Sequence, residues 1–167
     1  ADRMVREYVE RLYCPAALAE RATVANSYAG ARDLAAWKAR VSEAWPRISV
    51  PHVESGGVDA VPEVGDILHV RAQVYLDGLQ PDDVLVEAVY GRAHDGDTLE
   101  NPERVELRPM PVEATTATGS IPAIGTVQFA GSVTLARAGS FGYNVRVVPR
   151  HPLLANPAEL GLIAVAR

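Results

Sequence analysis

The sequence predicts a mainly β protein, an immunoglobulin-like antiparallel β-sandwich preceded by two or three α-helices. Up to Trp45, apolar residues recur at helical spacing, and after Pro46 they alternate with polar residues at strand spacing. Short turn-forming stretches separate the alternating segments at fairly regular intervals, as in sandwich domains. We therefore expect a helical segment over residues 1–46 and a sandwich domain over residues 47–167.

The first helix is predicted from Asp2 onward. Apolar and aromatic side chains occupy one helix face, and charged side chains occupy the opposite face. Asp2 can cap the N-terminus, and Pro15 either stops this helix or opens the next one at its first position. The apolar face consists of Met4, Val5, Tyr8, Val9, Leu12 and Tyr13.

Two further helices are expected before the strands begin. Residues 16–29 are alanine-rich, and Gly30 marks the end of that helix. The next helix runs from about Asp33 to Trp45, and Pro46 ends it because proline cannot continue the helical hydrogen bonds. Its apolar stripe is formed by Leu34, Trp37, Val41 and Trp45.

Alternation of apolar and polar residues predicts the strands that follow. In residues 67–76 the even-numbered residues are apolar and share one face of a half-buried strand. Residues 78–83 and 94–97 carry turn-forming residues. The proline-interrupted, threonine-rich residues 109–122 are predicted to form a mobile loop. The seven or eight expected strands include residues 48–53, 67–76, 84–90, 105–107, 127–135 and 141–147, with an edge strand within 160–165.

Composition excludes several classes of protein. The formal net charge of −5 is spread thinly over 167 residues, without the basic stripe that a nucleic-acid binder needs. No apolar run approaches the roughly 20 residues that span a bilayer. The single cysteine, Cys14, cannot form an internal disulfide, which suits a reducing compartment. We expect a cytoplasmic protein that binds neither nucleic acid nor membrane.

No catalytic motif occurs in the chain. It lacks a G-x-S-x-G elbow, a Walker loop and a G-x-G-x-x-G that opens a helix. Nothing around Cys14 marks it as a nucleophile. His94, Asp95 and Asp97 form the densest group of potential metal ligands, but Asp-Gly between two strands is what a hairpin turn requires, and the turn is favoured. We expect no catalytic, cofactor or metal site in this chain.

Two other polar groups receive structural interpretations. Asp82 and Asp83 follow Pro81 and are interpreted as turn residues. His151 lies between Pro149 and Pro152, which fix the backbone on both sides. For His151, a role in a rigid backbone segment that leaves the last long strand is favoured over a binding function.

Aromatic residues suggest a sugar-binding surface. Tyr75, Tyr90 and Tyr143 lie on predicted strands, where their rings are placed to stack on sugar faces. The aromatic content of 6% is low for a dedicated carbohydrate-binding surface. Trp37 and Trp45 belong to the apolar helix stripe and are expected in a core or an interface.

Stretches near both ends of the chain resemble α-glucan (glycogen) phosphorylases, and together they extend over most of its length. They are moderately specific, because they are structural rather than catalytic. Asp2–Val9 resembles the helix that closes the catalytic region, and residues 11–15 resemble the bacterial, actinobacterial-type branch, which continues into an extra C-terminal domain. Residues 141–152 and 159–162 resemble the end of those longer enzymes, and residues 34–38 and 45–46 fit the connection.

The resemblance implies a parent glycosyltransferase that phosphorolyses α-1,4-glucans to glucose 1-phosphate with pyridoxal phosphate bound to a lysine. The cofactor lysine and the phosphate loops of the family would lie upstream of Ala1. Lys38, the only lysine, lies on a predicted helix in the wrong context for a Schiff base. The resemblance therefore implies a non-catalytic C-terminal accessory domain, with no cofactor of its own, in a parent protein that is an enzyme.

Three functions remain open at this point. The leading one is an accessory domain that docks onto the upstream catalytic region of the same protein, forms oligomer contacts in a homo-oligomer, or shapes the approach of α-glucan. The second is a stand-alone glucan-binding module, and the third is an immunoglobulin-like protein-interaction module. The candidate residues are Met4, Val5, Tyr8 and Leu12 for docking, and Tyr75, Tyr90 and Tyr143 for glucan contacts.

Overall fold

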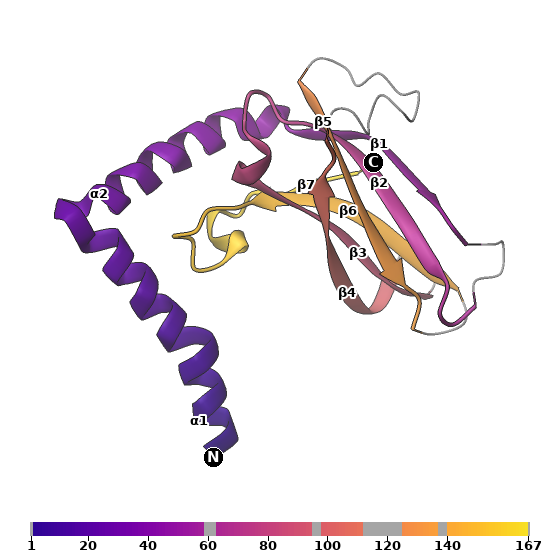
Figure 1. Ribbon diagram of the computed structural model, residues 1–167, viewed down its shortest axis with the longest axis horizontal. Helices are drawn as coiled ribbons and strands as arrows, with labels where there is room; N and C mark the ends of the chain where they lie inside the picture. Colours follow the sequence, from indigo (N-terminus) through magenta and orange to yellow (C-terminus); the bar gives the residue numbers. More distant parts are fainter. Residues whose placement is uncertain (1, 59–62, 95–97, 112–124, 137–139, 167) are drawn as a thin grey trace.

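A computed structural model describes residues 2–58, 63–94, 98–111, 125–136 and 140–166. A bent helical arm leads into a β-sandwich, and the N-terminus lies at the far end of the arm (Figure 1). Asp95 and Asp97 of the predicted turn, and most of the predicted loop at residues 109–122, lie outside the described residues.

The helical arm begins with α1 (Asp2–Tyr8), a π-helical turn η1 (Val9–Tyr13) and α2 (Cys14–Ala44). Pro15 lies in the first turn of α2, directly after the π-helical turn. The Cys14 N–H bonds to the Val9 carbonyl, so the backbone widens just before the proline ring, which would clash in a regular α-helix. The first two predicted helices are therefore joined without a break.

A sharp bend, here called the elbow, divides α2 at Ala25–Tyr28. Asn26, Ser27 and Tyr28 have φ values of 50°, 55° and 63°, in the left-handed region. Such a conformation costs a non-glycine residue on the order of 1 kcal/mol or more. The Arg32 guanidinium donates to the Ser27 carbonyl at 2.6 Å and satisfies one acceptor at the bend. The second helix therefore ends a few residues before the predicted end at Gly30.

The part of α2 after the elbow confirms the third predicted helix. Trp37 and Val41 are buried, and Leu34 packs at the edge of the same core. The helix ends at Ala44 and continues into a 3-10 turn, η2 (Trp45–Arg47), which contains Pro46. This half of α2 thus packs on the sandwich, whereas the half before the elbow extends away from it (Figure 1).

Seven antiparallel strands form one strongly curved sheet in the described part of the chain. Its strand order is β1-β2-β5-β4-β3-β6-β7. Short 3-10 turns, η3 (Pro81–Asp83) and η4 (Pro157–Leu160), precede β3 and β7. The strands are β1 (Ser49–Gly56), β2 (Ile67–Tyr75), β3 (Val84–His94), β4 (Thr98–Pro109), β5 (Thr126–Thr134), β6 (Phe141–Pro149) and β7 (Ala164–Val165).

The sheet folds into two layers, β1-β2-β5 and β4-β3-β6-β7, and almost closes into a barrel because the edge strands β1 and β7 also lie close together. The layers are joined where Arg108 and Pro109 of β4 pair with Ala130 and Phe129 of β5. Gly131 permits this approach, since a Cβ there would lie 2.7 Å from Leu107 Cδ2. The predicted mainly β architecture is confirmed and is consistent with a sandwich.

The core contains the residues that alternation assigned to the inner face. Even-numbered residues of β2 and β3 are buried opposite odd-numbered residues of β5 and β6. Trp37 and Val41 of α2 extend the same core, so the helix is part of the sandwich rather than an appendage to it. The largest fully buried side chains include Phe129, Leu76, Leu107, Val41, Val70, Val74, Val86, Val145 and Val147.

The buried carboxylate of Asp83 joins α2 to the sandwich. Its Oδ1 accepts hydrogen bonds from Trp37 Nε1 and from Arg40 Nη2, each at 2.8 Å. Its Oδ2 accepts from the Gln80 N–H at 2.9 Å and closes the η3 turn. The backbone N–H of Arg150 donates to the Asp83 carbonyl at 2.9 Å. One residue therefore links the helix, the turn before β3 and the exit from β6.

Replacing Asp83 should destabilise the fold. Asp83→Ala leaves the buried Trp37 Nε1 without an acceptor and opens the η3 turn, so we expect a loss of about 2–4 kcal/mol in the free energy of unfolding. Chemical denaturation followed by tryptophan fluorescence measures it. The matched control is Asp82→Ala, at an exposed position in the same turn, which should stay within about 0.5 kcal/mol of the parent chain. Equal effects of the two substitutions would contradict the role given to Asp83.

Candidate functional site

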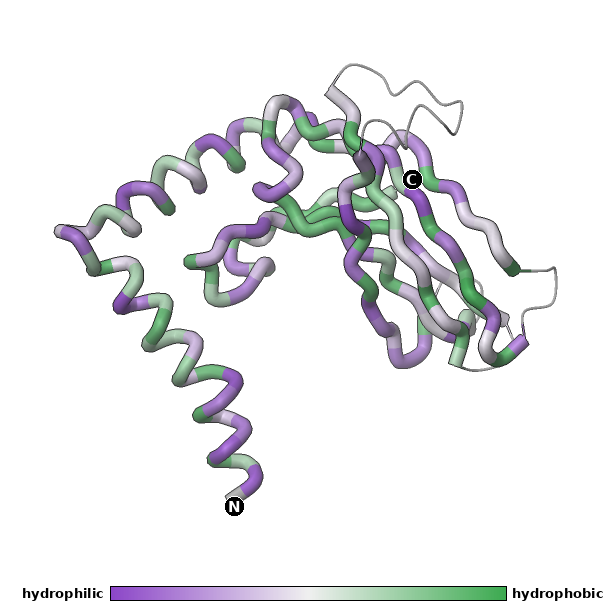
Figure 2. The backbone as a smooth tube through the Cα atoms, viewed as in Figure 1, coloured by the Kyte–Doolittle hydropathy of each residue, from purple (hydrophilic) through white to green (hydrophobic). Residues whose placement is uncertain are grey.

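The N-terminal half of the arm leaves an apolar face uncovered. Met4, Val5, Tyr8 and Leu12 are between 48% and 57% exposed. Apolar and polar positions alternate along this half, and it lies away from the sandwich (Figure 2). These four side chains lie on the consecutive helical segments α1 and η1. The structure thus brings the predicted docking residues together on one exposed segment.

Two of the three candidate tyrosines lie together. Tyr90 of β3 is directly opposite Tyr143 of β6, and the Tyr90 ring lies 5.8 Å from the ring of Phe141. The Tyr90 hydroxyl donates to Glu103 Oε2 at 3.0 Å. Burial, and then the Glu103 carboxylate, raise the pKa of Tyr90. These rings are half-buried and pack against one end of the core.

Tyr75 lies on a different surface. It is out of phase with the buried Val74 and Leu76, so it belongs to the outer face of β2. Its hydroxyl donates to Asp77 Oδ1 at 3.3 Å. The three tyrosines therefore do not form one aromatic platform.

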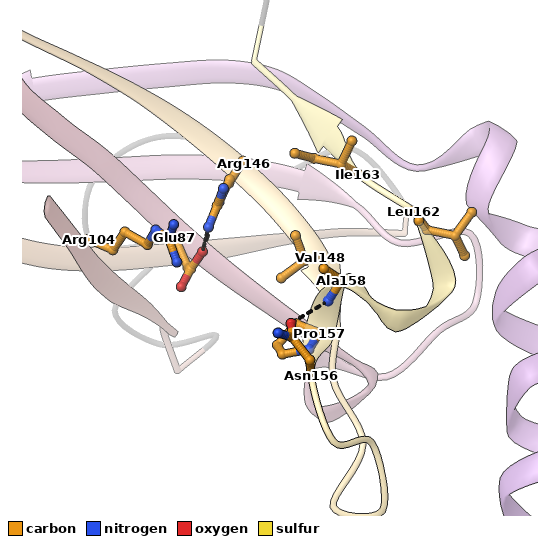
Figure 3. Close-up of a pocket in the computed structure, with 10 residues that line it drawn as sticks. Glu87, Arg104, Arg146, Val148, Asn156, Pro157, Ala158, Leu162 and Ile163 are labelled. Atoms are coloured by element: carbon orange, nitrogen blue, oxygen red, sulfur yellow. Dashed lines mark hydrogen bonds and ion pairs between the residues drawn. The ribbon is translucent and has the colours of Figure 1, made fainter. Parts of the chain in front are cut away.

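A pocket of about 420 Å³ opens on the outer face of the layer that contains β3, β4 and β6 (Figure 3). Glu87, Arg104 and Arg146 project into it from these three strands. The opposite wall comes from the segment between β6 and β7, which contributes Asn156 and Leu162. The pocket is thus formed by strands and by a C-terminal segment that folds back over them.

Local sequence explains the path of that segment. The Asn156 side-chain oxygen accepts from the Ala158 N–H at 2.9 Å and caps η4, and Pro157 suits the first helical position. Gly161, with φ 65°, then reverses the chain. Lys38 of α2 donates to Glu159 Oε1 at 2.7 Å, and this hydrogen bond lowers the pKa of the Glu159 carboxyl. These contacts hold η4 beside the pocket.

The charges in the pocket do not cancel. Arg146 donates through Nε and Nη2 to Glu87 Oε2, at 2.8 and 2.7 Å, and both side chains are mostly buried. Arg104 has no ion-pair partner within the described residues. Two guanidinium groups therefore face one carboxylate, which leaves one positive charge in excess.

This pocket is not evident from the sequence. Alternation places Glu87 and Arg146 on the outer face of their strands, but the two residues are 59 positions apart. Only the pairing of β3 with β6 brings them opposite each other.

The described residues contain no group of three or more His, Cys, Asp or Glu side chains placed to hold a metal ion. No helix in the described ranges is long and apolar enough to cross a membrane.

Comparison with known proteins identifies the family. Residues 45–167 match the family model described as the glycogen phosphorylase C-terminal domain. The chain belongs to this family. Its relatives include the glycogen phosphorylases of Mycobacterium bovis and Mycobacterium tuberculosis, each 44% identical over 99% of this chain. The maltodextrin phosphorylase of Thermococcus litoralis is 32% identical over 64% of the chain. No solved structure matches.

The resemblance drawn from the sequence motifs is confirmed, and the chain corresponds to a C-terminal region of these relatives. It spans 18% of the length of the mycobacterial proteins. The residues present do not fit a pyridoxal phosphate site, because the only lysine of the chain, Lys38, is engaged by the carboxylate of Glu159.

His151 belongs to the junction at Asp83. Its ring lies 4.8 Å from the ring of Trp37, and its Nδ1 accepts the Leu153 N–H at 3.1 Å. Burial lowers the pKa of His151, the nearby Asp83 carboxylate opposes that effect, and the Arg40 guanidinium adds to it. The neutral ring therefore suits the fold, since protonated Nδ1 could not accept the amide hydrogen. These contacts hold the segment after β6 against α2.

The stability of the chain should depend on the protonation of His151. The pKa of His151 is lower in the fold than its ordinary value of 6.5, so the unfolded chain binds the proton more readily. The resulting stability is complete above that ordinary value and is lost as the pH falls toward the folded pKa. His151→Asn keeps an acceptor but cannot titrate. We expect the parent chain to lose more stability than this variant in urea denaturation between about pH 8 and pH 5. Parallel curves would contradict the assignment.

Proposed function

We propose that this chain is a non-catalytic accessory domain of an α-glucan phosphorylase, and that its helical arm docks onto the catalytic region of the same protein. The observation that carries the proposal is the apolar face of the arm, with Met4 and Leu12 both 57% exposed. Contiguous apolar surface of several hundred Å² on a soluble protein marks an interaction site. The share of the mycobacterial relatives that the chain spans, 18%, supports a partner within the same polypeptide.

The elbow separates a helical half that packs on the sandwich from a helical half that is free to contact a partner. The half of α2 after the elbow packs into the core through Trp37 and Val41. The half before the elbow offers Tyr8 and Leu12 to a partner. We propose residues 1–46 as the docking and connecting segment, and residues 47–167 as the immunoglobulin-like accessory domain.

The proposal extends to the parent protein. The relatives are glycogen and maltodextrin phosphorylases. We propose a cytoplasmic, homo-oligomeric glycosyltransferase that phosphorolyses α-1,4-glucan with pyridoxal phosphate, with all of that chemistry outside this chain. The accessory domain would then position the catalytic region, contact a neighbouring subunit or shape the approach of long glucans.

The glucan-binding alternative has less support. A sugar platform needs rings that share one exposed face, but Tyr75 lies on a different surface from Tyr90 and Tyr143. The Tyr90 ring is also packed against Phe141. Docking is therefore the function that the geometry supports best.

Hydrogen–deuterium exchange tests the docking proposal. A chimera is made in which this chain replaces the matching C-terminal region of the Mycobacterium tuberculosis relative. We expect amides of residues 3–13 to exchange at least about ten-fold more slowly in the chimera than in the chain alone, because packing suppresses local opening of the helix. Tyr8→Gln combined with Leu12→Gln should remove most of this protection.

The matched control for this experiment is Arg6→Gln combined with Glu10→Gln on the charged face of the same helix. Amides of β3 provide an internal reference, since they belong to the sandwich in both proteins. Equally fast exchange of residues 3–13 in the chimera and in the chain alone would overturn the docking proposal.

A further inference from the structure

The pocket in Figure 3 shares no residue with the apolar face of the arm. It lies on the outer face of the sandwich and is lined by β3, β4, β6 and the segment around η4. Its volume of about 420 Å³ is within the range of small-molecule sites. The side chains that line it decide which class of small molecule fits.

Charge on this face favours an anion. The Glu87 carboxylate is neutralised by Arg146, and its cross-strand neighbour Glu106 is neutralised by Arg150, whose Nη1 lies 2.7 Å from Glu106 Oε1. Arg104 lies on the same face without an ion-pair partner among the residues that the structure describes. The excess positive charge is therefore located at Arg104.

The hydrogen-bonding groups in the pocket are mainly donors. Arg104 offers its whole guanidinium, and Arg146 keeps Nη1 because Nε and Nη2 bind Glu87. The Asn156 oxygen is used by the Ala158 N–H, which leaves the amide NH₂ to donate. Glu87 Oε1 is the acceptor that remains on the polar wall, since Arg146 binds Oε2. A ligand that matches this set is rich in acceptor oxygens and carries at least one hydroxyl.

A phosphate group suits the two arginines better than a carboxylate. Arg104 and Arg146 come from strands on either side of β3. The oxygens of a phosphate are arranged tetrahedrally and can be shared between two guanidinium groups, and such charge-assisted bonds are among the strongest in proteins. Val148, Pro157 and Leu162 form an apolar wall for the carbon skeleton of the ligand.

We propose that this pocket binds a small phosphate monoester that bears hydroxyl groups, with its phosphate on Arg104 and Arg146 and a hydroxyl on Glu87. The Glu87–Arg146 pair holds both side chains in place before the ligand enters. The site is independent of the apolar face of the arm, so it stands whether or not the docking proposal holds.

Three probes test the site on the 167-residue chain by calorimetry at constant ionic strength. Glucose 1-phosphate carries both a phosphate group and sugar hydroxyls. Inorganic phosphate lacks the sugar hydroxyls, and glucose lacks the phosphate. We expect saturable binding of glucose 1-phosphate, weaker binding of inorganic phosphate and no measurable binding of glucose. Amide chemical shifts should change at Asn156, Ala158 and Gly161.

Substitution of Arg104 distinguishes a specific site from general attraction of anions. Arg104→Gln removes the unpaired guanidinium from an exposed position, so the fold should persist, and the affinity for glucose 1-phosphate should fall about ten-fold or more. The matched control, Arg71→Gln, removes a guanidinium from the ion pair with Glu54, outside this pocket, and should leave the affinity unchanged.

Three results would overturn the proposal. The first is an absence of saturable binding of glucose 1-phosphate. The second is an equal loss of affinity in the Arg104 and Arg71 variants, which would mean non-specific attraction. The third is equal affinity for glucose 1-phosphate and for either inorganic phosphate or glucose, because the site would then not bind both the phosphate and the hydroxyl groups.

Discussion

The fold depends on one buried carboxylate. Asp83 accepts hydrogen bonds from Trp37 and Arg40 of α2, and its carbonyl accepts one from Arg150 at the exit of β6. A buried indole N–H without an acceptor carries a desolvation penalty of about 1–3 kcal/mol, so the hydrogen bond from Trp37 to this carboxylate favours the observed position of the second half of α2 on the core. Since η2 leads directly into β1, the same contact also sets where the first strand enters the sheet.

Periodicity made much of this architecture predictable. Val70 and Val74 are buried because alternation leaves one face of β2 apolar, and Trp37 and Val41 are buried because they are four positions apart on one helix face. The elbow was harder to predict, since residues 25–28 contain neither proline nor glycine, and Asn26, which tolerates the left-handed conformation, is the one local signal there.

The pocket and the role of Asp83 could not be predicted from the sequence, for a different reason. Both depend on which distant segments become neighbours. Glu87 and Arg146 meet only because β3 pairs with β6, and Asp83 meets Trp37 across 46 positions. A turn residue and an outward-facing charge are unremarkable in a sequence, and they gain a role only through their neighbours. The family motifs near the chain ends, in contrast, are contiguous, and so the family could be identified without the structure.

The backbone torsions of the elbow set the direction of the helical segment that precedes it. From Asp2 to Val24 the helical arm rises about 1.5 Å per residue and is therefore about 35 Å long. A difference of about 10° at Asn26–Tyr28 would displace its tip by about 6 Å, roughly one helical turn. Two family members with identical sandwiches and identical arms would thus present the tip at different places if a few backbone torsions differed. The position of the tip relative to the sandwich is thus set by backbone angles at four exposed residues, 25–28.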